Sequence, residues 1–252
     1  MGSQYMRRNL LLTMMYDGRL FHGWQVQNNA PSVQEAFQQA LYQVIGERPD
    51  IKGCSRTDAG VHANQYCVSF HTAHTIPTDR LPLALNRFLP PTIAVFKACE
   101  VAEDFHARYS CKGKEYIYKI NNAAVRNPFL EGYALHYWHS LDERVMNEAA
   151  QYLVGRHDFT SFCTVDPKRQ KGDFHRTVKH IAVERDGDMV TVTIEADGFL
   201  YNMVRIIVGT LLQVAQGKTA PAEIPAILQA LDRTKAGPTA PPQGLYLNRV
   251  FY

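Results

Sequence analysis

Two spacings of apolar residues alternate along the chain. Runs with apolar side chains at every second position predict β-strands, and runs with a repeat near 3.6 predict amphipathic helices. The strand-like runs cover residues 9–16, 65–71, 93–98, 115–121, 177–185, 189–196 and 244–251. The helix-like runs cover residues 32–44, 78–88, 140–154, 202–216 and 222–231. This mixture predicts an α+β fold.

Local signals place the starts of two helices. Ser32 with Glu35, and Ser140 with Glu143, have the spacing of a capping box, in which each side chain bonds the other residue's backbone N–H. Gly155 is expected to stop the second helix.

Each half of the chain has strands, a capped helix and further strands. This repetition predicts two related subdomains, residues 6–105 and 106–252. We expect them to share a mainly antiparallel central sheet with flanking helices, and to enclose an active-site cleft. The helix at 202–216 is apolar almost all round, which predicts a buried position, with Arg205 as its lone charge.

Composition excludes several classes of protein. The 252 residues are 46% hydrophobic and 20% charged, which is typical of a globular protein. The net charge of +3 means that any nucleic-acid surface must come from local clustering of basic residues. The five cysteines include no CxxC pair, which fits a reducing cytoplasm. We expect no membrane span, because no apolar run approaches about 20 residues, and no secretory signal.

The segment at residues 53–63 carries the candidate chemistry. Small residues surround the triplet Arg56-Thr57-Asp58, so backbone and ligand can approach each other closely. For an isolated Asp-x-Gly, a turn with a local hydrogen bond is the better interpretation. Here the eleven residues must be interpreted together, and as a whole they favour a functional loop over a simple turn.

The string resembles the signature loop of the tRNA pseudouridine synthase I family, also called tRNA pseudouridine synthase A. Further blocks similar to the family's motifs follow in the family's order, at Tyr16-Asp17-Gly18, Phe21-His22-Gly23-Trp24-Gln25, Ser32-Val33-Gln34-Glu35, Ala84-Leu85-Asn86, Asp104-Phe105-His106-Ala107-Arg108, Tyr116-x-Tyr118, Asp158–Phe162, Met203–Gly209 and Gly244-Leu245-Tyr246-Leu247. The resemblance implies an isomerase that converts uridine to pseudouridine in the anticodon stem-loop, at tRNA positions 38–40. It also implies a homodimer and no cofactor.

The resemblance assigns Asp58 as the catalytic carboxylate. An ionised carboxylate in a water-poor pocket needs a nearby cation, because desolvation alone would neutralise it. Arg205 fits this role, and the alternative is that it reaches the surface or pairs with Glu195 or Asp197. Tyr116 corresponds to the family's active-site tyrosine, with packing in the core as its alternative. Tyr118, two positions on, is expected to support the core.

The remaining candidates are expected to contact substrate. Arg56 is placed to assist base flipping or bind a phosphate, and Thr57 to organise the loop backbone. His62 is a candidate RNA contact, with a satisfied loop histidine slightly favoured. Leu245 is a candidate apolar wall of the pocket, although a leucine is by default a core residue. We expect no metal, because Cys54, His62 and Cys67 match no common zinc spacing.

Basic residues cluster in two stretches. The first stretch contains Arg108, Lys112, Lys114 and Lys119, and the second contains Lys168, Arg169, Lys171, Arg176 and Lys179. Such runs are usually solvated surface, but RNA binding requires phosphate neutralisation. The aromatic residues Phe21, Trp24 and Tyr109 could stack on unpaired bases, although core packing is the favoured role for Trp24.

Two rival functions remain open. One is a catalytically degenerate RNA-binding protein of the same fold, which would bind tRNA without forming product. The other is a hydrolase with Asp58 as general acid, which would need a second carboxylate, with Asp17 and Asp104 as candidates.

Overall fold

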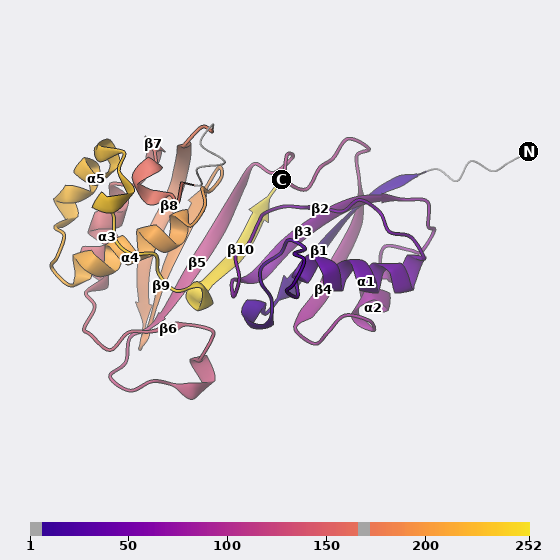
Figure 1. Cartoon of the computed structure of the whole chain (residues 1–252), viewed down its shortest axis with the longest axis horizontal. Coiled ribbons are helices and arrows are strands. Elements are labelled where there is room, and N and C mark those ends of the chain that lie inside the picture. The colour runs from indigo at the N-terminus through magenta and orange to yellow at the C-terminus, as the bar shows by residue number, and fades with distance from the viewer. Residues whose placement is uncertain (1–6, 166–171) are drawn as a thin grey trace, which may run out of the picture. The chain divides into compact units, whose positions relative to one another are not determined.

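The chain divides into two compact units in the computed structural model, which describes residues 7–165 and 172–252 (Figure 1). Unit 1 comprises Met1–Lys112 and Leu247–Tyr252, and unit 2 comprises Gly113–Tyr246. The domain boundaries expected from the sequence, 6–105 and 106–252, stay a prediction.

Unit 1 is built on long, neighbouring strands of a sheet. These are β1 (Arg8–Tyr16), β3 (His62–Thr72), β4 (Ile93–Val101) and the part of β10 (Leu245–Phe251) that belongs to this unit. Strand β1 lies between β4 and β3, and β10 borders β3. The two-residue strand β2 (Lys52–Gly53) pairs with β3. Most side chains of β1 and β3 are buried, so these strands form the middle of the unit.

Two helices accompany this sheet. Helix α1 (Val33–Ile45) begins at Ser32, whose Oγ accepts the backbone N–H of Glu35 at 3.2 Å. It ends at Gly46, which has a φ of 69°. The start agrees with the cap predicted at Ser32, and a glycine at a positive φ is a common helix end. Helix α2 (Leu81–Asn86) is shorter than expected and contacts α1 and β4.

Unit 2 contains mainly antiparallel strands. Its strands are β5 (Gly113–Asn121), β6 (Leu135–His136), β7 (Gly155–Asp158), β8 (His175–Asp186) and β9 (Met189–Ala196). The order is β5-β9-β8-β7, with the short β6 parallel to β5. The hairpin expected at Asp186-Gly187 joins β8 to β9, and Gly187 has a φ of 57°. Strands β2, β6 and β7 were not predicted from the sequence.

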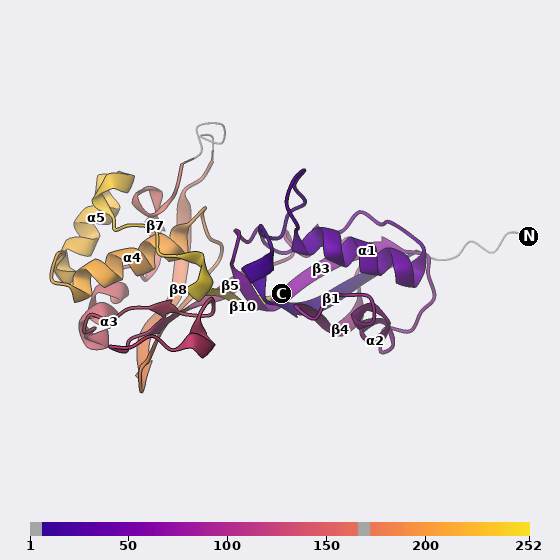
Figure 2. The same cartoon turned by 60° about the horizontal axis from the view of Figure 1, so that its bottom comes forward.

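Three helices of unit 2 lie together on one side of its sheet (Figure 2). They are α3 (Glu143–Gln151), α4 (Met203–Ala215) and α5 (Ile224–Ala230). Helix α4 is buried along nearly its whole length, as its apolar sequence predicts. The backbone at Pro238 comes so close that a Cβ on Gly209 would overlap its carbonyl oxygen. Mixed α and β elements with a mainly antiparallel sheet and flanking helices confirm the α+β class.

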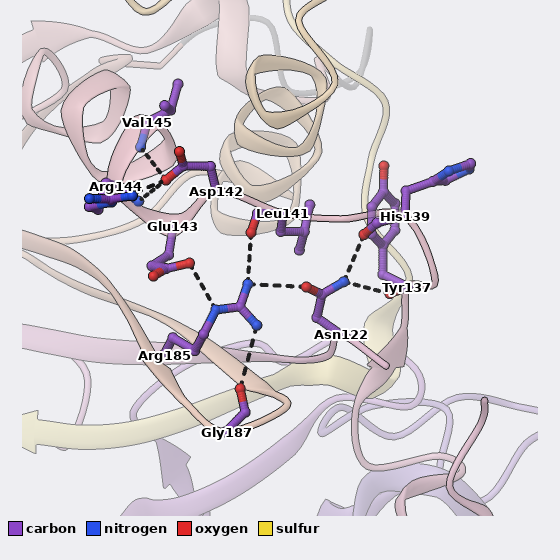
Figure 3. Close-up of polar contacts among 10 residues, drawn as sticks. All are labelled: Asn122, Tyr137, His139, Leu141, Asp142, Glu143, Arg144, Val145, Arg185 and Gly187. Atoms are coloured by element: carbon purple, nitrogen blue, oxygen red, sulfur yellow. Dashed lines mark hydrogen bonds and ion pairs between the residues drawn. The ribbon is translucent and has the colours of Figure 1, made fainter. Parts of the chain in front are cut away.

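The predicted capping box at Ser140 is wrong. The N-cap of α3 is Asp142, whose carboxylate accepts the backbone N–H of Arg144 at 3.0 Å. Glu143 instead accepts a 2.8 Å hydrogen bond from Nε of Arg185, on β8 (Figure 3). The same guanidinium donates to the carbonyl of Leu141 at 2.8 Å, so a long-range contact fixes where α3 begins.

The end of α3 also differs from expectation. The helix ends at Gln151, before Gly155, which has a φ of 106° and begins β7. Gly155 therefore begins strand β7, which was not predicted from the sequence, and does not end α3.

Candidate active site

The signature loop leaves β2 and returns to the sheet at β3. Its first residue, Cys54, is buried and donates its backbone N–H to the carbonyl of Cys67 at 2.9 Å. Gly53 lies against the side chains of Trp24 and Tyr66, and a Cβ there would overlap both. The rings of Trp24 and Tyr66 stack with centroids 4.3 Å apart. This packing explains why the residue directly before the loop must be a glycine.

Thr57 anchors the loop to two other parts of unit 1. Its Oγ1 lies 2.7 Å from the hydroxyl of Tyr16, at the end of β1. Its carbonyl accepts the backbone N–H of Trp24 at 3.2 Å. Gly23 has a φ of 89°, and a Cβ on it would overlap the Thr57 carbonyl oxygen. Thr57 is buried, so its contacts organise the backbone next to Asp58.

Asp58 opens a tight turn. Its carbonyl accepts the backbone N–H of Val61 at 3.2 Å, and Gly60 in the turn has a φ of 78°. The N–H of Gly60 bonds the carbonyl of Phe21 at 3.2 Å. A glycine is favoured at a positive φ, which accounts for the Asp-x-Gly pattern. Asp58 itself is half-buried, between the buried Thr57 and the exposed Ala59.

His62 is almost fully buried, with 2% of its surface exposed. Its Nδ1 accepts the backbone N–H of Gly18 at 3.0 Å and lies 3.4 Å from a carboxylate oxygen of Asp17. Because Nδ1 is an acceptor, the neutral ring carries its proton on Nε2. These contacts link the end of the loop to the turn after β1, and they favour a structural role for His62.

Arg56 is exposed on the same loop. It lines a pocket of about 360 Å³ in unit 1, together with Ser55 and residues from two other segments.

Tyr116 lies on β5 in unit 2, opposite Ile194 of β9. Tyr116 is 6% exposed, and its ring meets that of Phe199 edge-on, with centroids 4.9 Å apart. Tyr118, two residues on, is fully buried and donates its hydroxyl to the carbonyl of Pro241 at 2.7 Å. Burial raises the pKa of Tyr118, so this phenol stays protonated. Tyr118 therefore fits the expected support role in the core.

Arg205 lies near the start of α4 and is half-buried. Its Nε donates to the carbonyl of Ala240 at 2.7 Å, and its Nη1 donates to Oδ1 of Asn202 at 3.1 Å. The backbone N–H of Ala240 in turn bonds the carbonyl of Arg205 at 3.0 Å. Asn202 has a φ of 60°, unusual for a residue other than glycine, so the guanidinium is held by a strained helix start.

Leu245 is buried at the first position of β10. The preceding Gly244 lies so close to the ring of Tyr118 that a Cβ on it would be 2.7 Å from the ring carbons. Leu245 therefore directly follows a glycine that packs tightly against the Tyr118 ring in unit 2.

The candidate residues thus fall into two groups. Unit 1 brings together Arg56, Thr57, Asp58 and His62, and unit 2 holds Tyr116, Arg205 and Leu245. The pairing of Asp58 with Arg205 stays a prediction. The supporting roles of Tyr16 and Asn202 were not predicted from the sequence.

Within the part of the chain that the structure describes, no group of three or more His, Cys, Asp or Glu side chains could hold a metal ion. Among these same residues, no helix combines the length and the apolar character needed to cross a bilayer. Lys168, Arg169 and Lys171 of the second basic stretch lie outside the described residues.

Comparison with known proteins identifies the family. The family model described as tRNA pseudouridine synthase matches residues 12–110 and 149–252. The chain belongs to the tRNA pseudouridine synthase family. It is 47% identical to tRNA pseudouridine synthase A of Thermoanaerobacter sp. (strain X514), over 97% of this chain and 100% of that protein. It is 48% identical to the proteins of the same name from Brevibacillus brevis and Moorella thermoacetica, over 97% and 96% of this chain and 100% and 99% of theirs.

Family membership agrees with the resemblance found in the sequence. The matched residues include the whole signature loop and all of α4, β9 and β10, so each candidate residue except Tyr116 lies inside the family model.

Proposed function

We propose that this protein isomerises uridine to pseudouridine in tRNA, with Asp58 as the catalytic carboxylate. The observation that carries the proposal is the family match across both units, which includes the loop that holds Asp58. The anchoring of that loop through Thr57, Gly60 and His62 supports it, because a catalytic carboxylate must be held in a fixed position.

The reaction breaks the bond between uracil and ribose and forms a new bond to C5 of the ring. No electrons are gained or lost, so the chemistry calls for no redox partner. Asp58 acts either by attack on the uracil ring or at the anomeric carbon of the ribose. Both routes need the carboxylate in its ionised form.

Arg205 supplies the positive charge that keeps Asp58 ionised in a water-poor site. Support comes from the resemblance and from the two hydrogen bonds that hold the guanidinium, to Ala240 and Asn202. A cation whose position is fixed acts on a carboxylate without reorganising during the reaction.

Tyr116 shapes the base pocket and helps remove the proton from C5 after the uracil has rotated. Leu245 forms an apolar wall of this pocket. Both assignments rest on the resemblance to the family, and the burial of both side chains is compatible with a site that excludes water.

The substrate region is the anticodon stem-loop, at tRNA positions 38–40, and the working form is a cytoplasmic homodimer that holds the tRNA across both subunits. Arg56 assists the flipping of the target base, while Thr57 and His62 hold the loop that presents Asp58.

The test is to incubate the purified protein with unmodified tRNA transcripts and to map pseudouridine by chemical labelling and primer extension. We expect signal at positions 38–40 that is lost in Asp58→Ala. Tight binding with no pseudouridine on any tRNA would instead indicate the catalytically degenerate RNA-binding protein. Release of uracil would indicate the hydrolase.

A further inference from the structure

A pocket of about 360 Å³ lies beside the signature loop in unit 1. Its lining comes from three segments that are far apart in the sequence: residues 24–34, the loop at 51–56 and the segment 106–109. Its volume lies at the low end of the range of about 300–1,000 Å³ that is usual for small-ligand sites. Three cationic side chains, Lys52, Arg56 and Arg108, line it.

The charged side chains that line the pocket are all positive. None of the described residues that line it is an aspartate or a glutamate. The nearby Asp50 forms an ion pair with Lys52 but is not part of the lining. The two arginines therefore provide most of the uncompensated positive charge, and both are exposed to an approaching ligand.

His106 adds a hydrogen-bond donor. Its Nδ1 accepts the backbone N–H groups of Arg108 and Tyr109, at 3.1 and 3.3 Å, so the proton of the neutral ring is on Nε2. Burial, and then the charge of Lys52, lowers the pKa of His106. The ring is therefore neutral at pH 7, and it contributes an N–H donor without a charge of its own.

Tyr109 provides an aromatic face at the same place. Tyr109 is 78% exposed, so most of its ring is accessible to a ligand. The ring lies 4.3 Å from that of His106, and Cζ of Arg108 is 5.9 Å from its centroid. An exposed aromatic ring beside cations is the usual platform on which an unpaired base stacks, while its phosphate is bound next to it.

We propose that this pocket binds one backbone phosphate of the RNA, held by Arg56, Arg108 and His106, with a neighbouring base stacked on Tyr109. The inference rests on the proposed function and names a contact site for its substrate. Arg56 and Asp58 are two residues apart, so their Cα atoms are separated by at most about 7 Å. The bound phosphate therefore lies within one or two nucleotides of the target uridine.

The first experiment measures tRNA affinity as a function of salt. Loss of one phosphate contact lowers the slope of log Kd against log salt by about 0.7 to 0.9. We expect this decrease for Arg108→Ala. Lys97→Ala is the matched control, because it removes one exposed positive charge from β4, away from the pocket lining, and it should leave the slope nearly unchanged. Equal slopes for Arg108→Ala and the wild type would overturn the proposal.

The second experiment locates the phosphate. Anticodon stem-loop oligonucleotides each carry one uncharged methylphosphonate linkage near the target uridine, and their affinities are measured with wild type and Arg108→Ala. Wild type should lose affinity at one linkage, and the variant should be insensitive to that linkage, because the two changes remove the same contact. If every linkage costs both proteins the same factor, the pocket does not bind the backbone.

Tyr109 is tested by two substitutions. Tyr109→Phe keeps the stacking face and should retain affinity. Tyr109→Ala should weaken binding about fivefold or more, with little change in the salt slope. An Ala variant that binds as well as the Phe variant would contradict base stacking.

Pseudouridine formation by the wild-type protein separates the two proposals. If the wild type forms pseudouridine but Arg108→Ala leaves the salt slope and linkage sensitivity intact, the phosphate site fails and the function stands. If the wild type forms none, the proposed function fails, and the binding data still decide whether the pocket holds a phosphate.

Discussion

The hydroxyl of Tyr16 lies 2.7 Å from Oγ1 of Thr57, and both side chains are buried. This hydrogen bond joins the end of β1 to the residue directly before Asp58. A central strand thereby holds the loop that carries the candidate catalytic carboxylate. The position of Asp58 thus depends on a residue 41 positions earlier than Thr57 in the chain.

Tyr16→Phe should destabilise the protein and lower turnover. The substitution leaves the Thr57 hydroxyl buried without this partner, which costs about 1–3 kcal/mol in the free energy of unfolding. We expect kcat for pseudouridine formation to fall more than tRNA affinity, because the loop loses its fixed position. Tyr42→Phe is the control, since Tyr42 is 44% exposed and its loss of a hydroxyl should change stability by less than about 0.5 kcal/mol. Equal behaviour of the two variants would refute this role for Tyr16.

Gly23→Ala should be much more harmful than Gly46→Ala. Both glycines have positive φ angles, 89° and 69°, so both substitutions carry a backbone cost of about 1 kcal/mol. At Gly46 a new Cβ would meet no atom within 4 Å, whereas at Gly23 it would overlap the carbonyl oxygen of Thr57. Only Gly23→Ala should therefore displace the loop and reduce kcat. Thermal unfolding and single-turnover rates for both variants check this, and an active Gly23→Ala enzyme would be the contrary result.

Arg205→Lys should not preserve activity, although it preserves the charge. The guanidinium makes separate hydrogen bonds to Ala240 and Asn202, and a lysine cannot reproduce this forked geometry. We expect stability to fall by about 1–2 kcal/mol and kcat to fall strongly. Arg185→Lys, in the network that begins α3, is the comparison: it should lose stability but keep kcat, since Arg185 binds Glu143 and Leu141 (Figure 3). If both variants keep kcat, Arg205 has no special part in the reaction.

Alkaline pH should destabilise the fold through Cys67. Burial raises the pKa of this thiol from 9.0 to about 11. The unfolded chain therefore releases the proton from about pH 9 upward, while the folded protein retains it until about pH 11. The free energy of unfolding should fall across this window by up to about 3 kcal/mol from this group. Denaturant unfolding of wild type and Cys67→Ala at several pH values isolates the effect, and parallel curves for the two proteins would contradict it.

Local sequence signals predicted those parts of the fold that depend on neighbouring residues. The cap at Ser32, the hairpin at Asp186-Gly187 and the apolar helix that became α4 are of this kind. The start of α3 was misplaced because a distant residue, Arg185, binds Glu143, and no local rule reports that contact.

In the candidate site, too, features set by neighbouring residues were predictable and features set by distant contacts were not. The loop around Asp58 was recognisable from its residue string, and Arg205 was recognisable as the lone charge of an apolar helix. The partners that fix these residues, Tyr16 for the loop and Asn202 for the guanidinium, could not be predicted. Tyr16 comes into place through the pairing of β1 with β3, and Asn202 through a left-handed backbone conformation that its residue type permits but does not require.

The most direct test of the account is the turnover of Asp58→Asn, measured alongside its tRNA affinity and its thermal unfolding. The amide has nearly the shape of the carboxylate but cannot carry its charge. We predict that pseudouridine formation falls by on the order of 10⁴ or more, while affinity and unfolding temperature stay close to those of the wild type. An Asp58→Asn protein that still forms pseudouridine at the wild-type rate would contradict the central claim.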